Sequence, residues 1–93
     1  MEAIVKQIIG RIESGVAFDS HFVIDTLIKE HSDDYLRFAA ENLALSGVTK
    51  YVHSEISKII LSLEGEAVEK LPYDSLSYNI HGDASRCALW RKL

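Results

Sequence analysis

The chain has 93 residues, of which 47% are hydrophobic and 26% are charged, and its formal net charge is −4 at pH 7. This length gives one domain with one modest core, and a single cysteine excludes an intramolecular disulfide and with it a secreted disulfide scaffold. Because no run approaches the roughly 18 consecutive apolar residues of a membrane span and the N-terminus does not resemble a signal peptide, we exclude a membrane protein and expect one cytoplasmic domain over residues 1–93.

The first half of the chain shows the spacing of amphipathic helices. We expect one helix at about residues 2–13, stopped at Ser14-Gly15, because five aliphatic side chains share one stripe there. These are Ile4, Val5, Ile8, Ile9 and Ile12. A second helix is expected at about residues 20–31, with Asp19 or Ser20 as its N-cap. The aromatic ring of Phe22 falls on the polar side of this second helix.

Two more helices are expected before residue 64. Ser32 has the character of an N-cap for a helix at about residues 33–44, and whether it separates two helices or kinks one long helix stays open. After a turn at Ser46-Gly47, Thr49 is expected to cap a helix at about residues 49–63. This last segment has the clearest apolar stripe of the chain, formed by Val52, Ile56, Ile59, Ile60 and Leu63.

After Gly65 the helical spacing of apolar residues ends. Residues 67–71 are expected to form a short strand that ends at Pro72, and residues 73–85 are rich enough in polar residues and glycine to predict a loop. Residues 87–93 are expected to return as a second strand. The predicted fold class is therefore α+β: a mainly helical N-terminal part, followed by a C-terminal antiparallel β-hairpin at about residues 66–93.

This layout resembles a winged helix-turn-helix domain. The expected helix at residues 33–44, the turn at Ser46-Gly47 and the longer helix at residues 49–63 resemble the helix-turn-helix. The stretch from Ile59 to Leu71 resembles the exit from a recognition helix into the first wing strand, residues 79–83 resemble the wing tip, and residues 87–91 resemble the returning strand. The resemblance covers most of the chain as a pattern of elements, without a diagnostic signature.

The resemblance implies binding to double-stranded DNA, with the helix at residues 49–63 in the major groove. With its apolar stripe turned inward, this helix would present polar residues outward, and the wing would add a histidine and an arginine. The residues that the resemblance implies as DNA-binding are Lys50, Tyr51, Ser54, Ser57, Lys58, His81 and Arg86. His53 flanks this face, and the simplest interpretation of its imidazole is that it is solvated.

The charge distribution bears on this interpretation. Residues 1–47 carry four basic and eight acidic side chains, which leaves −4, whereas residues 48–93 carry six of each and are neutral. A strongly basic nucleic-acid binder would look different, but a neutral half still allows one face to meet phosphate. The acidic half also raises the possibility of a protein partner instead of DNA.

Other chemistry finds little support in the sequence. No acid–base or nucleophile constellation stands at a recognisable spacing, so we expect a protein that is not an enzyme and has no catalytic residues. The histidines at positions 21, 31, 53 and 81 and Cys87 show no tight metal-ligand spacing, so neither a metal site nor a cofactor is expected. Cys87 is interpreted as a small core or interface residue, and Trp90 as a core residue that closes the hairpin onto the helices.

Two hypotheses about function follow. The first is a small regulator of transcription that binds double-stranded DNA as a homodimer, with the first helix and leftover apolar residues at the dimer contact. Those leftover residues are Phe18, Phe22, Phe38 and Leu45. The second is an acidic adaptor or inhibitor that binds a protein partner, of the kind that phages and mobile elements encode. Neither hypothesis involves a membrane.

Overall fold

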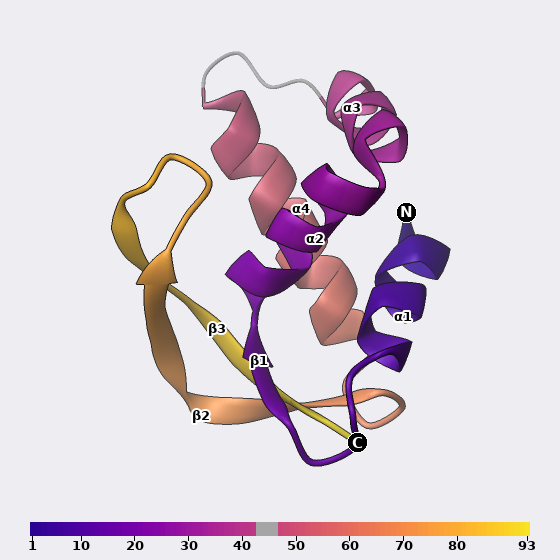
Figure 1. Ribbon diagram of the computed structural model, residues 1–93, viewed down its shortest axis with the longest axis vertical. Coiled ribbons are helices and arrows are strands. Elements are labelled where there is room, and N and C mark those ends of the chain that lie inside the picture. Colours follow the sequence, from indigo (N-terminus) through magenta and orange to yellow (C-terminus); the bar gives the residue numbers. More distant parts are fainter. Residues whose placement is uncertain (43–46) are drawn as a thin grey trace.

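A computed structural model describes residues 1–42 and 47–93 of the chain. The described residues form four helices and three strands, in the order α1 (Glu2–Gly10), β1 (Ala17–Asp19), α2 (Ser20–Glu30), α3 (Ser32–Glu41), α4 (Val48–Ser62), β2 (Val68–Tyr78) and β3 (Ala84–Lys92). The strands form one antiparallel sheet in the order β1-β3-β2, and the β2–β3 hairpin extends beside the helices (Figure 1). The predicted α+β class, with helices followed by a hairpin, is confirmed. Among the described residues, none of the helices combines the length and the hydrophobicity needed to cross a membrane.

The helix boundaries differ from the predicted ones in ways that the backbone explains. The first helix ends at Gly10 instead of residue 13, because the N–H groups of Arg11 and Ile12 bond to carbonyls three residues earlier and tighten the chain into a turn. At His31 the backbone leaves the helical region (φ −136°, ψ 45°), so α2 and α3 are two separate helices. The predicted helix at residues 33–44 starts one residue earlier than expected, and its last two positions lie outside the described residues.

Only one of the predicted helix caps is confirmed. Asp19 is the N-cap of α2, where its carboxylate accepts a hydrogen bond of 2.8 Å from the backbone N–H of Phe22. Ser32 is the first residue of α3 and makes no capping bond, so its prediction as a cap was wrong. Thr49 was also wrong as a cap, because α4 begins one residue before it, directly after Gly47 in the left-handed region (φ 62°).

The hairpin is longer than predicted. Strand β2 continues through Pro72 to Tyr78, so the expected strand end at Pro72 was wrong, and only residues 79–83 of the loop expected at residues 73–85 lie outside the strands. Proline is tolerated here because β2 is an edge strand and its register with β3 shifts between Lys70 and Asp74, where the ladder does not need the missing N–H. The turn between the strands lies at residues 79–83, as predicted for the wing tip.

Strand β3 is the centre of the sheet and connects it to the helices. It pairs with β2 on one side and with β1, a three-residue strand that the sequence did not reveal, on the other. Trp90 faces Phe18 across one pairing and Lys70 across the other. Its side chain is 1% exposed, which agrees with its prediction as a core residue, and its indole Nε1–H donates a 3.0 Å hydrogen bond to the buried hydroxyl of Ser20.

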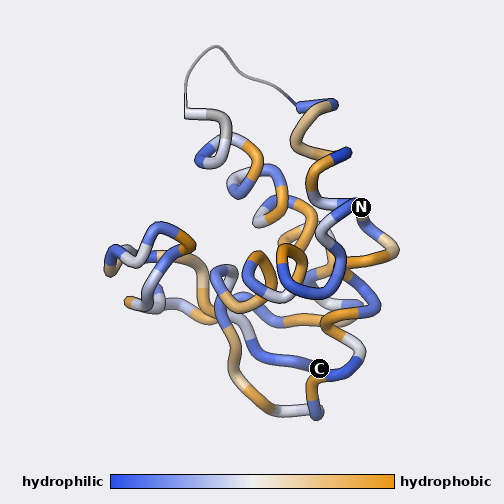
Figure 2. Tube along the Cα trace, turned by 45° about the horizontal axis from the view of Figure 1, so that its top comes forward, coloured by the Kyte–Doolittle hydropathy of each residue, from blue (hydrophilic) through white to orange (hydrophobic). Residues whose placement is uncertain are grey.

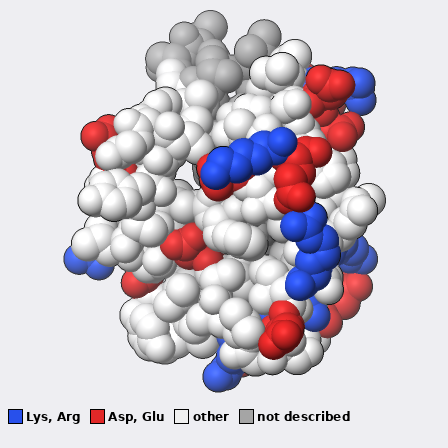
Figure 3. All heavy atoms as spheres, viewed as in Figure 1, with Lys and Arg blue, Asp and Glu red and all other residues white. Residues whose placement is uncertain are grey.

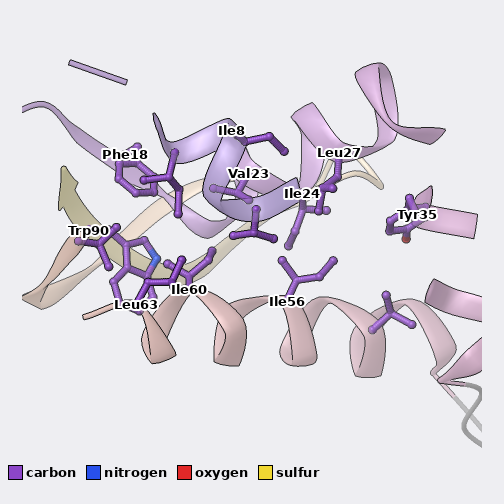
Figure 4. Close-up of a cluster of buried hydrophobic side chains, with 14 residues drawn as sticks. Ile8, Phe18, Val23, Ile24, Leu27, Tyr35, Ile56, Ile60, Leu63 and Trp90 are labelled. Carbon is purple, nitrogen blue, oxygen red and sulfur yellow. The ribbon is translucent and has the colours of Figure 1, made fainter. Parts of the chain in front are cut away.

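The core lies between α1, α2, α4 and the sheet. Figure 2 shows hydrophobic residues recurring along each helix, and Figure 4 shows the buried side chains forming one cluster that extends from Phe18 and Trp90 to Tyr35. The apolar stripe of α4 is turned inward as predicted, with Val52, Ile56 and Ile60 completely buried. The other core members are Val5, Ile8, Ile9, Phe18, Val23, Ile24, Leu27, Tyr35, Leu63, Val68 and Trp90.

The Ser20–Trp90 hydrogen bond leads to a stability prediction. Replacing Ser20 by alanine leaves the buried indole N–H without its partner, so Ser20→Ala is expected to lower the free energy of unfolding by about 1–3 kcal/mol. In a Trp90→Phe background the donor is absent, and the same serine substitution should cost much less. Urea unfolding followed by circular dichroism measures the four members of this cycle, with the exposed Ser62→Ala as control. Equal costs of Ser20→Ala in both backgrounds would contradict the assignment.

Two glycines make a matched pair for a second prediction. Gly65 has a φ of +86°, which alanine adopts only with strain, so Gly65→Ala is expected to lower the free energy of unfolding by about 1 kcal/mol or more. Gly10 lies at an exposed helical position with open space around an added Cβ, so Gly10→Ala should raise it by about 0.5–1 kcal/mol. The urea midpoint of unfolding is expected to fall in Gly65→Ala and to rise in Gly10→Ala. If the two midpoints shift in the same direction, the prediction for one of the two sites is wrong.

Candidate nucleic-acid interface

The outward face of α4 carries the polar residues that the sequence predicted there. Lys50, Ser54 and Lys58 are exposed, Tyr51 is 43% exposed and Ser57 is half-buried. The two lysines are therefore not covered by the rest of the protein. Lys58 forms an ion pair of 3.1 Å with Glu55 on the same helix, an arrangement that partly neutralises the C-terminal part of this face.

A hollow of about 300 Å³ lies between α4, the start of α2 and the hairpin. Its lining brings together four of the seven predicted residues: Lys50, Ser54, Ser57 and Arg86. Arg86 belongs to β3, so the helix and the hairpin contribute cations to the same surface. Of the other three, Tyr51 and Lys58 lie on α4 and His81 lies in the exposed hairpin turn, all outside this lining.

The electrostatics of this hollow favour an anion. Neither Lys50 nor Arg86 forms an ion pair with any part of the chain that the structure describes. Two unpaired cations and two serine hydroxyls are suited to binding a phosphate group. The neighbouring hollow of about 320 Å³ is lined instead by the carboxylates of Asp19 and Asp25, which would repel phosphate on that side.

The hairpin is held against the start of α2 by a network of polar side chains. The Asp19 carboxylate accepts hydrogen bonds from the hydroxyls of Ser75 at 2.8 Å and of Ser77 at 2.7 Å, both on β2. The Ser77 hydroxyl is also 2.7 Å from Nδ1 of His21, and the hydroxyl of Ser85 on β3 is 3.4 Å from Nε2 of the same ring. We call these five residues the hairpin network. Because they join β1 and α2 to both hairpin strands, they set the position of Arg86 relative to α4.

The pKa of Asp19 reflects this network. Burial acts to raise the pKa of the carboxyl, but the hydrogen bonds from Ser77, from the Phe22 N–H and from Ser75 outweigh burial and leave the pKa below its ordinary value. Asp19 is therefore an ionised acceptor in the folded protein at neutral pH. The sequence indicated only its capping role, since its hairpin partners are 56 and 58 positions away in the chain.

His53 differs from its predicted solvated state. Its ring is half-buried, and Nε2 lies 2.8 Å from the hydroxyl of Tyr35 on α3. Burial lowers the pKa of His53, and the nearby charges of His81 and His21 lower it further. Burial also raises the pKa of the Tyr35 hydroxyl, so both groups are neutral at pH 7. The sequence did not indicate this contact, which joins two residues that lie 18 positions apart on different helices.

Comparisons of the chain with protein-family models, with curated proteins and with solved structures find no match.

The lowered pKa of His53 predicts a pH dependence of stability. A histidine whose folded pKa lies below its unfolded value takes up a proton on unfolding, so it contributes stability above about pH 6.5 that is lost as the pH falls below that value. We expect wild type to lose more unfolding free energy between pH 7.5 and pH 5 than His53→Gln, which cannot titrate there. Urea unfolding at the two pH values measures this difference. An NMR titration that gave His53 an ordinary or raised pKa would contradict it.

Proposed function

We propose that this protein is a small winged-helix DNA-binding protein that regulates transcription. The observation that carries the proposal is the hollow in which Lys50, Ser54 and Ser57 of α4 meet Arg86 of the hairpin. A single face with exposed cations from two elements suits a duplex, whose phosphates lie on either side of a groove. The acidic half of the chain contributes Asp19 and Asp25 to the adjoining hollow, outside the proposed contact.

The order of elements supports the same class. Helix α4 comes directly before the hairpin, as a recognition helix comes before the wing, and α3 comes before α4 as the first helix of a helix-turn-helix would. The hairpin is also part of a larger sheet, because the short strand β1 between α1 and α2 pairs with the returning strand β3. This chain has one further helix, α2, directly before the pair α3 and α4 that we compare with a helix-turn-helix.

The proposed contact is mainly to phosphates. The N-terminal turns of α4 would enter the major groove, with Lys50 near a phosphate and Tyr51 and Ser54 near the bases. Arg86 and His81 of the hairpin would meet the neighbouring backbone. The described outward face of α4 has no arginine, asparagine or glutamine, the residue types that make the strongest bidentate base contacts, so sequence discrimination is expected to be modest and salt dependence strong.

A homodimer remains part of the proposal, with a smaller contact than the one expected from the sequence. In the described structure Val5, Ile8 and Ile9 of α1 are buried within their own protomer, as is Phe18. Phe22 stays 47% exposed and is available to a second copy. Leu45 lies outside the described residues.

DNA binding is tested by fluorescence anisotropy with labelled duplexes of random and palindromic sequence. Wild type is expected to bind at low salt, with log K falling linearly with log salt concentration. Lys50→Ala and Arg86→Ala should each weaken binding and reduce the salt slope by about 0.9 per bound protomer, and the double variant by about 1.8 per bound protomer. The matched control is Lys6→Ala on α1, which removes an exposed lysine outside the proposed face.

The controls separate failure of the contact from failure of the fold. Circular dichroism checks that each variant keeps the wild-type structure. If folded wild type shows no affinity for any duplex at low salt, the DNA-binding function is wrong. If Lys6→Ala weakens binding as much as Lys50→Ala, the protein binds DNA, but through another face.

A second candidate function, binding to a protein partner, is favoured by the outer face of β2. Three large apolar side chains of β2 are strongly exposed: Tyr73, Leu76 and Tyr78. Ile80, in the hairpin turn, is 39% exposed. Charged side chains are sparse over the hairpin in Figure 3, whereas they gather over the helices on the opposite side of the same view. Exposed apolar surface of this kind marks protein interfaces. This alternative would be supported if the protein shows no affinity for DNA and forms a stable complex with a protein partner that Leu76→Ser abolishes.

A further inference from the structure

Three potential metal ligands of different chemistry meet where the hairpin touches the start of α2. A carboxylate oxygen of Asp19, a ring nitrogen of His21 and the sulfur of Cys87 all lie within 4.8 Å of one another. They come from the end of β1, the first turn of α2 and the middle of β3, respectively. All three residues are half-buried, so the cluster is shielded from bulk solvent without being closed off.

The surroundings hold each of the three groups in a defined orientation. The Asp19 carboxylate is fixed by the Phe22 N–H on one oxygen and by Ser75 on the other. The His21 ring has a serine hydroxyl near each nitrogen, Ser77 at Nδ1 and Ser85 at Nε2. A metal would displace the serine hydroxyl from one of these two nitrogens, and the serine at the other nitrogen would remain as the kind of outer hydrogen bond that typically fixes the tautomer of a metal-binding histidine.

The sulfur of Cys87 is a protonated thiol in the metal-free protein. Burial raises the pKa of the Cys87 thiol, and the nearby Asp19 carboxylate raises it further, so the free protein keeps the proton. The backbone N–H groups of His21 and Ser20 and the hydroxyl of Ser77 act in the opposite direction and lower the pKa. A divalent cation would replace the thiol proton, which passes to solvent, and those two N–H groups would then stabilise the bound sulfur.

We propose that Asp19, His21 and Cys87 form a binding site for a divalent transition metal, with Zn²⁺ as the best match. One sulfur, one nitrogen and one oxygen form a donor set that suits Zn²⁺, whereas Mg²⁺ and Ca²⁺ prefer sites made of oxygen ligands alone. Three protein ligands leave a fourth tetrahedral position for water or for the hydroxyl of Ser77. This hydroxyl, 4.0 Å from the sulfur, now bridges Asp19 and His21. The proposal does not depend on DNA binding.

A metal bound at this site would fix the hairpin to the helical part of the protein. Asp19 and His21 belong to the helical side of the molecule, and Cys87 is the neighbour of Arg86 on the hairpin. A metal bound to all three would join the two sides more firmly than the hairpin network alone. Because it would bind the folded state and not the unfolded chain, it should also raise the melting temperature, by an amount that grows with the logarithm of the metal concentration relative to Kd.

The test is a titration of the metal-stripped full chain with Co²⁺, a spectroscopic substitute for Zn²⁺. We expect one Co²⁺ per chain, with a sulfur-to-cobalt charge-transfer absorption and the visible bands of tetrahedral cobalt, and displacement by Zn²⁺. Cys87→Ser should abolish the charge-transfer band, and Ser75→Ala should weaken binding by about tenfold through the loosened carboxylate. The matched control is His81→Ala, which removes an exposed histidine of the hairpin turn and should leave the titration unchanged.

The outcomes are distinct. Absence of the charge-transfer band in folded wild type overturns the site, as does a titration that Cys87→Ser leaves unaltered. Loss of binding in His81→Ala with retention in His21→Gln would also overturn it, since the ligand would be the wrong histidine. A Zn²⁺-dependent rise in the melting temperature of wild type, absent in Cys87→Ser, supports it. DNA affinity, measured separately with and without Zn²⁺, does not enter this judgement.

Discussion

The indole of Trp90 is the point at which the sheet and the helices become one structure. Its strand pairs on both sides, and its side chain is 1% exposed within the core that the sheet and the helices share. The buried N–H must be satisfied, and the hydroxyl of Ser20 does so from the first residue of α2. The ammonium group of Lys70 lies 5.9 Å from the ring centroid on the β2 side. A single side chain thus determines where α2 begins relative to β3.

The proposed functions depend on that placement. Once α2 starts beside β3, Asp19 and His21 stand next to the serines of the hairpin, and their hydrogen bonds hold the hairpin beside α4. Arg86 then reaches the hollow that Lys50 borders. The same contact brings the sulfur of Cys87 to Asp19 and His21. The candidate DNA-binding face and the candidate metal site are therefore two consequences of one junction between the hairpin and α2.

Predictions based on local periodicity agreed well with the structure. The inward stripe of α4 and its exposed lysines follow from spacing alone, because a helix with Val52, Ile56 and Ile60 on one side can bury only that side. Turn and cap details were less reliable, since a serine or threonine near a helix start competes with other ways of satisfying the first N–H groups. Pro72 was misread as a strand end, because its tolerance depends on the edge position and register shift of β2, which are properties of the assembled sheet.

The sequence by itself determined the α+β class, the helical segments, the buried tryptophan and the polar face of α4, because each depends on residues within a few positions of one another. Only the tertiary structure decided that Ala17–Asp19 is a strand, that His53 bonds to Tyr35, and that Asp19, His21 and Cys87 meet. These contacts join residues from 18 to more than 60 positions apart in the chain. Such pairings leave no periodic signal, since they depend on how whole elements pack and not on the local pattern of any one of them.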